Sequence, residues 1–346
     1  MSADANIEQA LQESVRAACA CGKALAICGA GTKRFYTGVA AGTPLDVTEH
    51  RGIVSYEPTE LVITARAGTP LQEIEAALAE KNQMLAFEPP HFGPNATLGG
   101  TIACNLSGPR RPYAGSARDF VLGMRIINGK GEILKFGGQV MKNVAGYDVS
   151  RLMTGSLGTL SVILEVSLKV LPKPAQELTL TFEMSADEAI HKMNRWAGQP
   201  LPLSAAAYSG EALSIRLSGS ATGVQAAHAK LGGVIAKSAN FWQELREQQL
   251  LFFQDQTPLW RLSIPAATPP LRIPGKWLLD WGGAQRWLKS DASALEIRSQ
   301  AQSVDGYATL FRGSQSNTRY KPELSPPAQL LQERIKHALD PAGILN

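Results

Sequence analysis

The sequence predicts an α+β protein with two domains, and three observations carry this prediction. Between residues 24 and 172, short apolar runs typical of strands alternate with closely spaced glycines. Beyond Pro174 the glycines become sparse, and alternating strand patterns are interleaved with helical ones. The chain of 346 residues, 44% of them hydrophobic, is long enough for two cores. We therefore expect one domain at 1–173 and a second at 174–346.

Hydrophobic spacing and turn residues predict the elements of the first domain. Ile7–Ala20 has apolar residues at helical spacing and is followed by Gly22, which favours a surface helix. Pro70, which suits a first helical turn, favours a helix over Leu71–Lys81. Asn128-Gly129 is typical of a hairpin turn. The expected strands are Ala24–Cys28, Leu45–Thr48, Gly52–Ser55, Leu61–Ala67, Phe120–Asn128, Glu132–Phe136 and Ser161–Val170.

The second domain mixes both periodicities. The expected strands are Leu178–Phe182, Leu213–Leu217, Leu259–Ile264 and Trp277–Trp281. The expected helices are Asp187–Trp196, Val224–Leu231, Asn240–Leu251 and Ala328–Leu339. This mixture favours an antiparallel α+β domain.

Composition excludes several classes of protein. The net charge of +4 is small and scattered, so a nucleic-acid surface is not indicated. No apolar run is long enough to span a bilayer, and the N-terminal segment is acidic where a signal peptide would be basic, so we expect a cytoplasmic protein. Disulfides are not expected there. The spacing of Cys19, Cys21 and Cys28 fits no usual ligand set, so we expect no metal site.

The glycine-rich half indicates a nucleotide cradle. Gly29-Ala30-Gly31-Thr32 follows an expected strand, so its backbone N–H groups and the Thr32 hydroxyl could face a diphosphate; an ordinary tight turn is the alternative. The chain has neither a Rossmann GxGxxG unit nor a P-loop. The glycines must therefore serve another architecture.

Several motifs in a fixed order resemble the FAD-linked oxidases of the vanillyl-alcohol-oxidase type. They are ATLGGTIA at 96–103, Arg118-Asp119, KNVAGYD at 142–148 and GSLGT at 155–159. Within that superfamily the sequence is most similar to the family of smaller FAD-binding subunits of bacterial glycolate oxidases (glycolate dehydrogenases). The similarity is dense from about residue 24 to 172 and continues in islands at 260–262, 277–283, 306–313 and 340–346.

The resemblance implies a two-subdomain PCMH-type FAD-binding domain followed by a smaller antiparallel α+β domain. It places the 29–33 turn at the FAD pyrophosphate, the 97–105 segment along the cofactor, and the 155–163 segment beside the flavin. The cofactor-binding residues it implies are Gly29, Ala30, Gly31, Thr32, Lys33, Thr97, Gly99, Gly100, Thr101, Asn105, Ser116, Asp119, Gly155, Gly158 and Ile163. Glycines at 99, 100, 155 and 158 would let the backbone lie against a ring system. No histidine follows the 29–33 turn, so we expect FAD to be bound noncovalently.

The catalytic residues stay open. The resemblance implies an FAD-dependent oxidoreductase that acts on CH–OH groups. The implied substrate is glycolate, a small 2-hydroxy acid, which is oxidised to glyoxylate. Catalytic relatives commonly have an acidic residue at the position of Leu157 and a GHxGDGNxH element where this chain has 306–313. The candidates that remain are Tyr307, Arg312 and His91. The Arg110-Arg111 pair either grips a carboxylate or phosphate or belongs to a solvated loop.

The family pattern also implies partners. These are a larger FAD-linked glycolate oxidase subunit and an iron–sulfur subunit. Any membrane contact is expected to be peripheral, at the inner membrane and through the complex. The missing acidic and histidine positions favour a flavin carrier. The alternatives are a self-sufficient FAD oxidoreductase for another alcohol or hydroxy acid and a flavinless scaffold. Relatives typically continue past Asn346 with a Pro-Gly pair, which leaves the end of the chain open.

Overall fold

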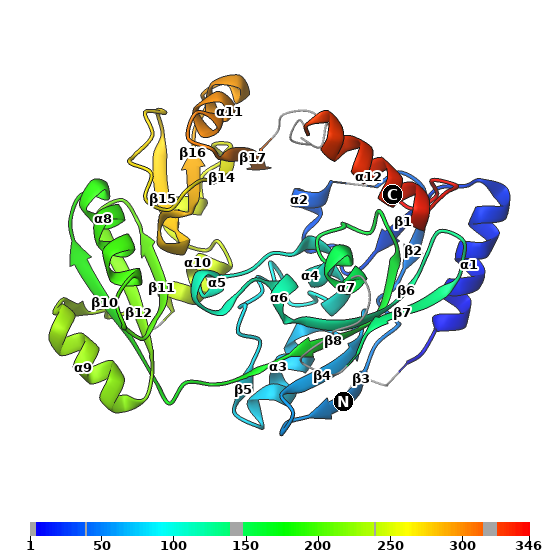
Figure 1. Ribbon diagram of the computed structural model, residues 1–346, viewed down its shortest axis with the longest axis horizontal. Helices are drawn as coiled ribbons and strands as arrows, with labels where there is room; N and C mark the ends of the chain where they lie inside the picture. Colours follow the sequence, from blue (N-terminus) through cyan, green and yellow to red (C-terminus); the bar gives the residue numbers. More distant parts are fainter. Residues whose placement is uncertain (1–4, 39, 139–147, 239, 314–323) are drawn as a thin grey trace. The chain divides into compact units, whose positions relative to one another are not determined.

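The protein is described from a computed structural model, which covers residues 5–38, 40–138, 148–238, 240–313 and 324–346 (Figure 1). Its internal contacts separate two compact units. The first unit comprises Met1–Ser107, Ser116–Lys173 and Glu323–Asn346, and the second comprises Gly108–Gly115 and Pro174–Pro322. Among the described residues, no helix is both long and apolar enough to span a membrane.

The first unit begins with a small parallel sheet covered by a helix. Strand β1 (Leu25–Cys28) pairs with β2 (Thr43–Asp46). Helix α1 (Glu8–Cys21) buries the face formed by Leu11, Val15 and Ala18, the positions predicted from helical spacing, and ends at Gly22 in the left-handed conformation. Residues 344–346 lie along β1: Leu25 N–H donates to the Ile344 carbonyl at 2.7 Å, and Asn346 N–H donates to the Leu25 carbonyl at 3.1 Å.

A five-stranded antiparallel sheet forms the rest of this unit (Figure 1). Its strand order is β3 (Ile53–Glu57), β4 (Val62–Arg66), β8 (Val162–Lys169), β6 (Val121–Ile127) and β7 (Ile133–Gly137). The predicted hairpin is confirmed, because β6 pairs with β7 across a turn in which Asn128 Oδ1 accepts from the N–H groups of Lys130 and Glu132. The other elements are α2 (Arg34–Thr37), α3 (Leu71–Ala79), β5 (Gln83–Met84), α4 (Leu98–Cys104), α6 (Ala117–Phe120), α7 (Val149–Met153) and β9 (Leu171–Pro172).

The C-terminal helix α12 (Pro326–Leu339) belongs to the first unit, whereas the sequence boundaries placed it in the second domain. The reason is an ion pair whose carboxylate, Asp340, is buried. Lys336 Nζ donates to Asp340 Oδ2 at 2.6 Å, to the Thr159 carbonyl at 2.6 Å and to the Leu345 carbonyl at 2.7 Å. Asp340, whose side chain is 0% exposed, also accepts from the N–H groups of Ile344 and Leu345. These contacts fasten residues 336–345 beside the first unit's strands.

The second unit is built on an eight-stranded antiparallel sheet, which confirms the predicted α+β class. The strand order is β13 (Val234–Ile235), β10 (Gln176–Glu183), β12 (Ala212–Gly219), β11 (Leu203–Tyr208), β15 (Lys276–Asp280), β16 (Gln285–Lys289), β14 (Leu259–Ser263) and β17 (Tyr307–Arg312). Helices α8 (Ala186–Ala197), α9 (Ala221–Leu231) and α11 (Ala294–Gln302) pack on apolar side chains of one face. The predicted helix at 240–251 is shorter, since α10 (Phe241–Arg246) ends before Gln248, whose φ is 56°.

Residues Gly108–Gly115 also belong to the second unit, which the sequence boundaries did not anticipate. Their short helix α5 (Arg111–Ala114) is held by an Arg110–Glu177 ion pair. The Gly108 carbonyl accepts a hydrogen bond from Trp281 Nε1 at 3.0 Å. Such contacts between distant positions leave no periodic trace in the sequence.

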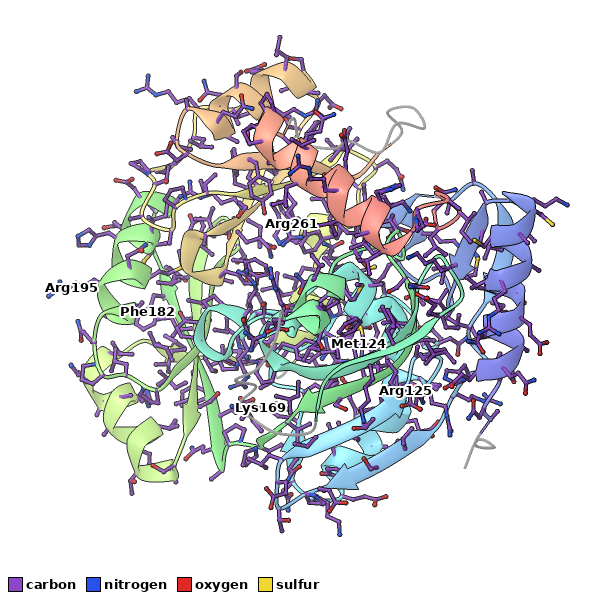
Figure 2. All side chains as sticks on the ribbon, turned by 45° about the vertical axis from the view of Figure 1, so that its right-hand side comes forward. Met124, Arg125, Lys169, Phe182, Arg195 and Arg261 are labelled. Atoms are coloured by element: carbon purple, nitrogen blue, oxygen red, sulfur yellow. The ribbon has the colours of Figure 1, made fainter. Side chains whose placement is uncertain are left out.

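His50 gives the first unit a testable pH dependence. Its side chain is fully buried, Nδ1 accepts from the Ile7 N–H at 3.3 Å, and Nε2 has no hydrogen-bond partner among the described residues. Burial, followed by the Arg66 charge, holds the pKa of His50 below its ordinary value of 6.5. The charges of Glu165 and Glu8 raise this pKa, whereas that of Arg125 (labelled in Figure 2) lowers it further.

We expect the contribution of His50 to the free energy of unfolding to be level above the unfolded pKa, about 6.5, and to fall as the pH drops below it. In this pH range His50 binds a proton in the unfolded chain but stays neutral in the folded chain, so a lower pH favours unfolding. His50→Asn keeps an acceptor for the Ile7 N–H and cannot titrate. Urea unfolding across this pH range should therefore give a flatter profile for the variant. Superimposable profiles for both proteins would contradict the assignment.

Candidate cofactor site

The turn after β1 lies against the start of helix α4. Gly31 has φ of 73°, which glycine adopts without strain. A Cβ atom on Gly29 would lie 3.0 Å from Thr97 Oγ1, so the close approach of the two segments favours glycine at this position. Thr97 is the N-cap of α4, and its Oγ1 accepts from the Gly100 N–H at 3.3 Å. The structure thus brings two of the predicted cofactor segments together.

The paired glycines of α4 have different environments. A Cβ on Gly99 would lie 2.7 Å from Ala67 Cβ and 3.1 Å from the Ala67 carbonyl oxygen, so Gly99 is required by packing of the helix on the end of β4. A Cβ on Gly100 would meet only Thr97 Oγ1, at 3.2 Å, within 4 Å. Gly100 therefore borders space that the described protein atoms do not fill.

A third segment, Gly155–Gly158, runs beside the C-terminal end of α4. Gly155 N–H donates to the Ile102 carbonyl at 3.0 Å, and Leu157 N–H donates to the Ala103 carbonyl at 2.9 Å. Gly155 and Gly158 have φ values of 93° and 78°, which a side chain would strain. Since a Cβ on Gly158 would lie 3.5 Å from Ile27 Cδ1, this turn also contacts β1.

Three buried polar atoms along these segments have no hydrogen-bond partner within the described part of the chain. They are Thr101 Oγ1, Asn105 Oδ1 and Ser156 Oγ. Buried polar groups without partners are costly and usually indicate an absent ligand or water. Hydroxyl and amide groups of this kind match the carbonyl and N–H edge of a flavin ring, so the residues present fit FAD. Ser156 was not among the predicted residues, although it lies within the GSLGT motif.

Lys33 is a buried positive charge within the first turn. It is 6% exposed, and its Nζ lies 3.4 Å from both Thr32 Oγ1 and the His91 carbonyl oxygen. A buried ammonium group beside a glycine turn is suited to an anionic diphosphate. The ring of the candidate His91 contacts Glu75, with Nε2 3.2 Å from Oε1. It is therefore the His91 carbonyl, and not the ring, that contacts Lys33 of this turn.

Three predicted cofactor residues have local structural roles. Ser116 and Asp119 form a capping box at α6, with the Ser116 N–H and Oγ each 2.8 Å from Asp119 Oδ2. Ile163 is buried in β8 opposite Ile126. Their predicted contact with the nucleotide stays a prediction. Most of the KNVAGYD motif, residues 142–147, lies outside the described residues.

The remaining catalytic candidates lie on β17 of the second unit. Tyr307 is 54% exposed and pairs with Ser263. Burial lowers the pKa of Arg312. Within the described ranges, no group of three or more His, Cys, Asp or Glu side chains is arranged to hold a metal ion.

Comparisons with known proteins agree with this geometry. Residues 4–137 match the family described as FAD binding domain. Over its full length the chain is 51% identical to glycolate oxidase subunit GlcE of Escherichia coli strain K12, of which it covers 98%. It is 36% identical over 143 residues to D-lactate dehydrogenase of Anaerostipes hadrus, a match of 41% of this chain and 30% of that protein. Glycolate oxidase subunit GlcD of Bacillus subtilis strain 168 is 34% identical over 128 residues, 37% of this chain and 27% of that protein.

A solved structure of alkyldihydroxyacetonephosphate synthase has a similar fold, with a TM-score of 0.68 and 14% identity over 97% of this chain and 74% of that chain. The fold and the glycine-lined site define an FAD-binding protein of the PCMH type. Within this class, the full-length identity is decisive. The chain belongs to the family of glycolate oxidase subunit GlcE.

Proposed function

We propose that the chain is the FAD-binding subunit of a glycolate oxidase complex that converts glycolate to glyoxylate. The full-length similarity to glycolate oxidase subunit GlcE is the observation that carries this proposal. The larger partner is an FAD-linked subunit of the GlcD type, and an iron–sulfur subunit completes the complex. The assembly is cytoplasmic, with peripheral contact to the inner membrane.

The residues of the first unit support FAD as the cofactor. The 29–33 turn with buried Lys33 would hold the diphosphate, while α4 and the 155–158 turn would hold the ring system. When bound, FAD supplies the two-electron acceptor of an alcohol oxidation. We propose noncovalent binding, because Cys104 is a buried residue at the end of α4 and Cys28 Sγ already donates to the Ala26 carbonyl at 3.2 Å.

The chain's own residues favour a carrier over the subunit that oxidises glycolate. Oxidation of a hydroxy acid needs a base beside the substrate hydroxyl. Leu157 occupies the position where catalytic relatives carry an acidic residue. The three unpartnered polar atoms, Thr101 Oγ1, Asn105 Oδ1 and Ser156 Oγ, belong to hydroxyl and amide groups, which orient a ring but do not accept a proton near neutral pH.

The purified chain is therefore expected to hold yellow FAD that stays oxidised when glycolate is added without oxygen, and to be reduced once the larger flavin subunit is present. The visible spectrum reports both steps. Acid precipitation should release all flavin into the supernatant, whereas flavin in the pellet would indicate a covalent bond. Tyr307→Phe serves as a control and should change neither step. Rapid bleaching of the isolated chain by glycolate would overturn the carrier role, and absence of flavin would overturn the proposed function.

A further inference from the structure

The sheet of the second unit has two unlike faces. One face is apolar and packs under α8, α9 and α11. On the strands the alternate positions carry polar side chains, among them Glu177, Arg216, Arg261, Asp280 and Gln285. Asp280 and Gln285 are only 3% and 4% exposed. Buried polar groups such as these two are costly unless they are hydrogen-bonded or bind something.

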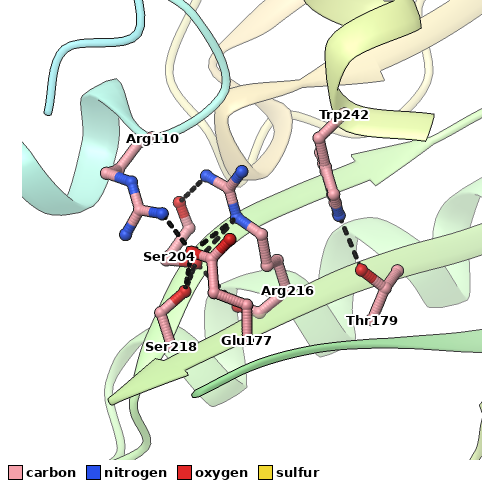
Figure 3. A network of polar contacts seen from close by, with 7 residues as sticks. All are labelled: Arg110, Glu177, Thr179, Ser204, Arg216, Ser218 and Trp242. Carbon is pink, nitrogen blue, oxygen red and sulfur yellow. Dashed lines mark hydrogen bonds and ion pairs between the residues drawn. The ribbon is translucent and has the colours of Figure 1, made fainter. Parts of the chain in front are cut away.

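One part of this face is satisfied by its own residues (Figure 3). Glu177 pairs with Arg110 and lies 3.9 Å from Arg216 Nε, while the Ser218 hydroxyl donates to Glu177 at 2.6 Å. Arg216 Nε also donates to Ser204 Oγ at 2.9 Å. The two arginines and the carboxylate thus form a closed network that fixes α5 on the sheet. This cluster needs no ligand.

Arg261, on the same face, has hydrogen-bond donors that no described residue uses. Its Nε donates to Gln285 Oε1 at 2.8 Å, and Gln285 Nε2 donates to Asp280 Oδ2 at 3.1 Å, so the buried carboxylate fixes the orientation of the amide. The guanidinium lies 5.3 Å from the centroid of the Trp281 ring. No described residue accepts a hydrogen bond from its Nη atoms, and no described carboxylate pairs with it. The planar end of the guanidinium is therefore held in place with its donors unused.

A second unused donor lies at the same turn. A Cβ on Gly282 would be 4.0 Å from the Tyr113 hydroxyl, which has no hydrogen-bond partner among the described residues. Burial, together with the Asp280 charge, raises the pKa of Tyr113 to about 12, so it stays a donor. Arg111 lies 4.3 Å from the Trp281 ring and adds positive charge there.

We propose that the Nη atoms of Arg261, with the Tyr113 hydroxyl, bind the carboxylate of a small 2-hydroxy or 2-oxo acid. An anchored guanidinium offers two parallel N–H donors that match a carboxylate. The ligand class rests on the proposed function, whereas the site rests on the geometry of the second unit. Arg261 and Tyr113 are both hydrogen-bond donors near neutral pH, so these two residues recognise the acid and supply no base for its oxidation.

Calorimetric titration of the full chain with glycolate tests the proposal. We expect Arg261→Gln to weaken binding at least about tenfold, because a charged hydrogen-bond donor is lost. Arg261→Lys should recover part of the affinity, since it keeps the charge without the fork. Tyr113→Phe should weaken binding by about fivefold. The matched control is Arg195→Gln, at an exposed arginine that points outward from α8 (Figure 2) and should change nothing.

Ethylene glycol, which lacks the carboxylate, and inorganic phosphate complete the design. Glycolate binding that depends on Arg261, with neither comparison compound bound, would support the site. Equal affinity in the wild-type and Arg261→Gln chains, or binding of phosphate in place of glycolate, would overturn it. If Arg261→Gln does not fold, the Tyr113→Phe and Arg261→Lys titrations decide. The outcome is independent of flavin content, so failure here is distinct from failure of the proposed function.

Discussion

Gly100→Val is expected to abolish FAD binding while the chain stays folded. A Cβ on Gly100 meets only Thr97 Oγ1 within 4 Å, at 3.2 Å, a tight contact that a small shift of the threonine side chain relieves. The valine methyl groups would instead occupy the space beside α4 where we propose that the cofactor lies. Flavin absorbance of the purified variant gives its FAD content, and circular dichroism reports the fold.

The chain contains a closely matched control for this substitution. Gly223 is the third residue of α9, and its N–H donates to the N-cap Ser220 Oγ at 3.2 Å, just as Gly100 is third in α4 and bonds to Thr97. Gly223→Val should therefore keep its FAD. Gly99→Val should lose its fold instead, because the new Cβ would collide with Ala67. Stoichiometric FAD in Gly100→Val would remove this position from the site.

Asp340→Ala is expected to destabilise the first unit by roughly 3 kcal/mol, the low end of the effect of removing one partner from a buried ion pair, because the Lys336 side chain is 30% exposed. The carboxylate is fully buried and accepts from Lys336 and from two backbone N–H groups. Without it, the N–H groups of Ile344 and Leu345 lose their acceptor. Because Lys336 also bonds to Thr159, next to the 155–158 turn, FAD affinity should fall as well.

Thermal unfolding, followed by circular dichroism and by release of flavin fluorescence, would measure both effects of Asp340→Ala. Asp187→Ala, at an exposed position in the first turn of α8, controls for the loss of an aspartate and should shift the midpoint little. A midpoint for Asp340→Ala within the scatter of this control would show that the ion pair does not support the first unit.

The sequence was informative where structure follows from local spacing. The α1 face at Leu11, Val15 and Ala18 and the Asn128-Gly129 hairpin were both readable, because each depends on neighbours a few residues apart. The ordered glycine motifs likewise predicted three segments that the structure brings together. They could not distinguish Gly99, whose Cβ would collide with Ala67, from Gly100, whose Cβ would meet only the Thr97 hydroxyl.

Other features depend on pairings across the chain. Lys336 and Asp340 are ordinary helix residues until Thr159 and Leu345 are placed beside them. The sequence does not mark Arg261 as a site residue, and the only local signal is its charge between the buried Trp260 and Leu262 of β14. Its role depends on Gln285 and Asp280, which reach it only through the order of the strands.

The pairing of Leu25 with residues 344–346 constrains the order in which the chain folds during synthesis. Strand β1 leaves the ribosome early, but its hydrogen-bonding partners Ile344 and Asn346 are made only after the whole second unit. Domains generally fold as units while synthesis proceeds. Here the FAD-binding unit cannot complete its small sheet until the second unit has been translated. The glycine-lined segments beside β1 therefore acquire their final support only after translation has passed residue 346, which makes tight cofactor capture a late step.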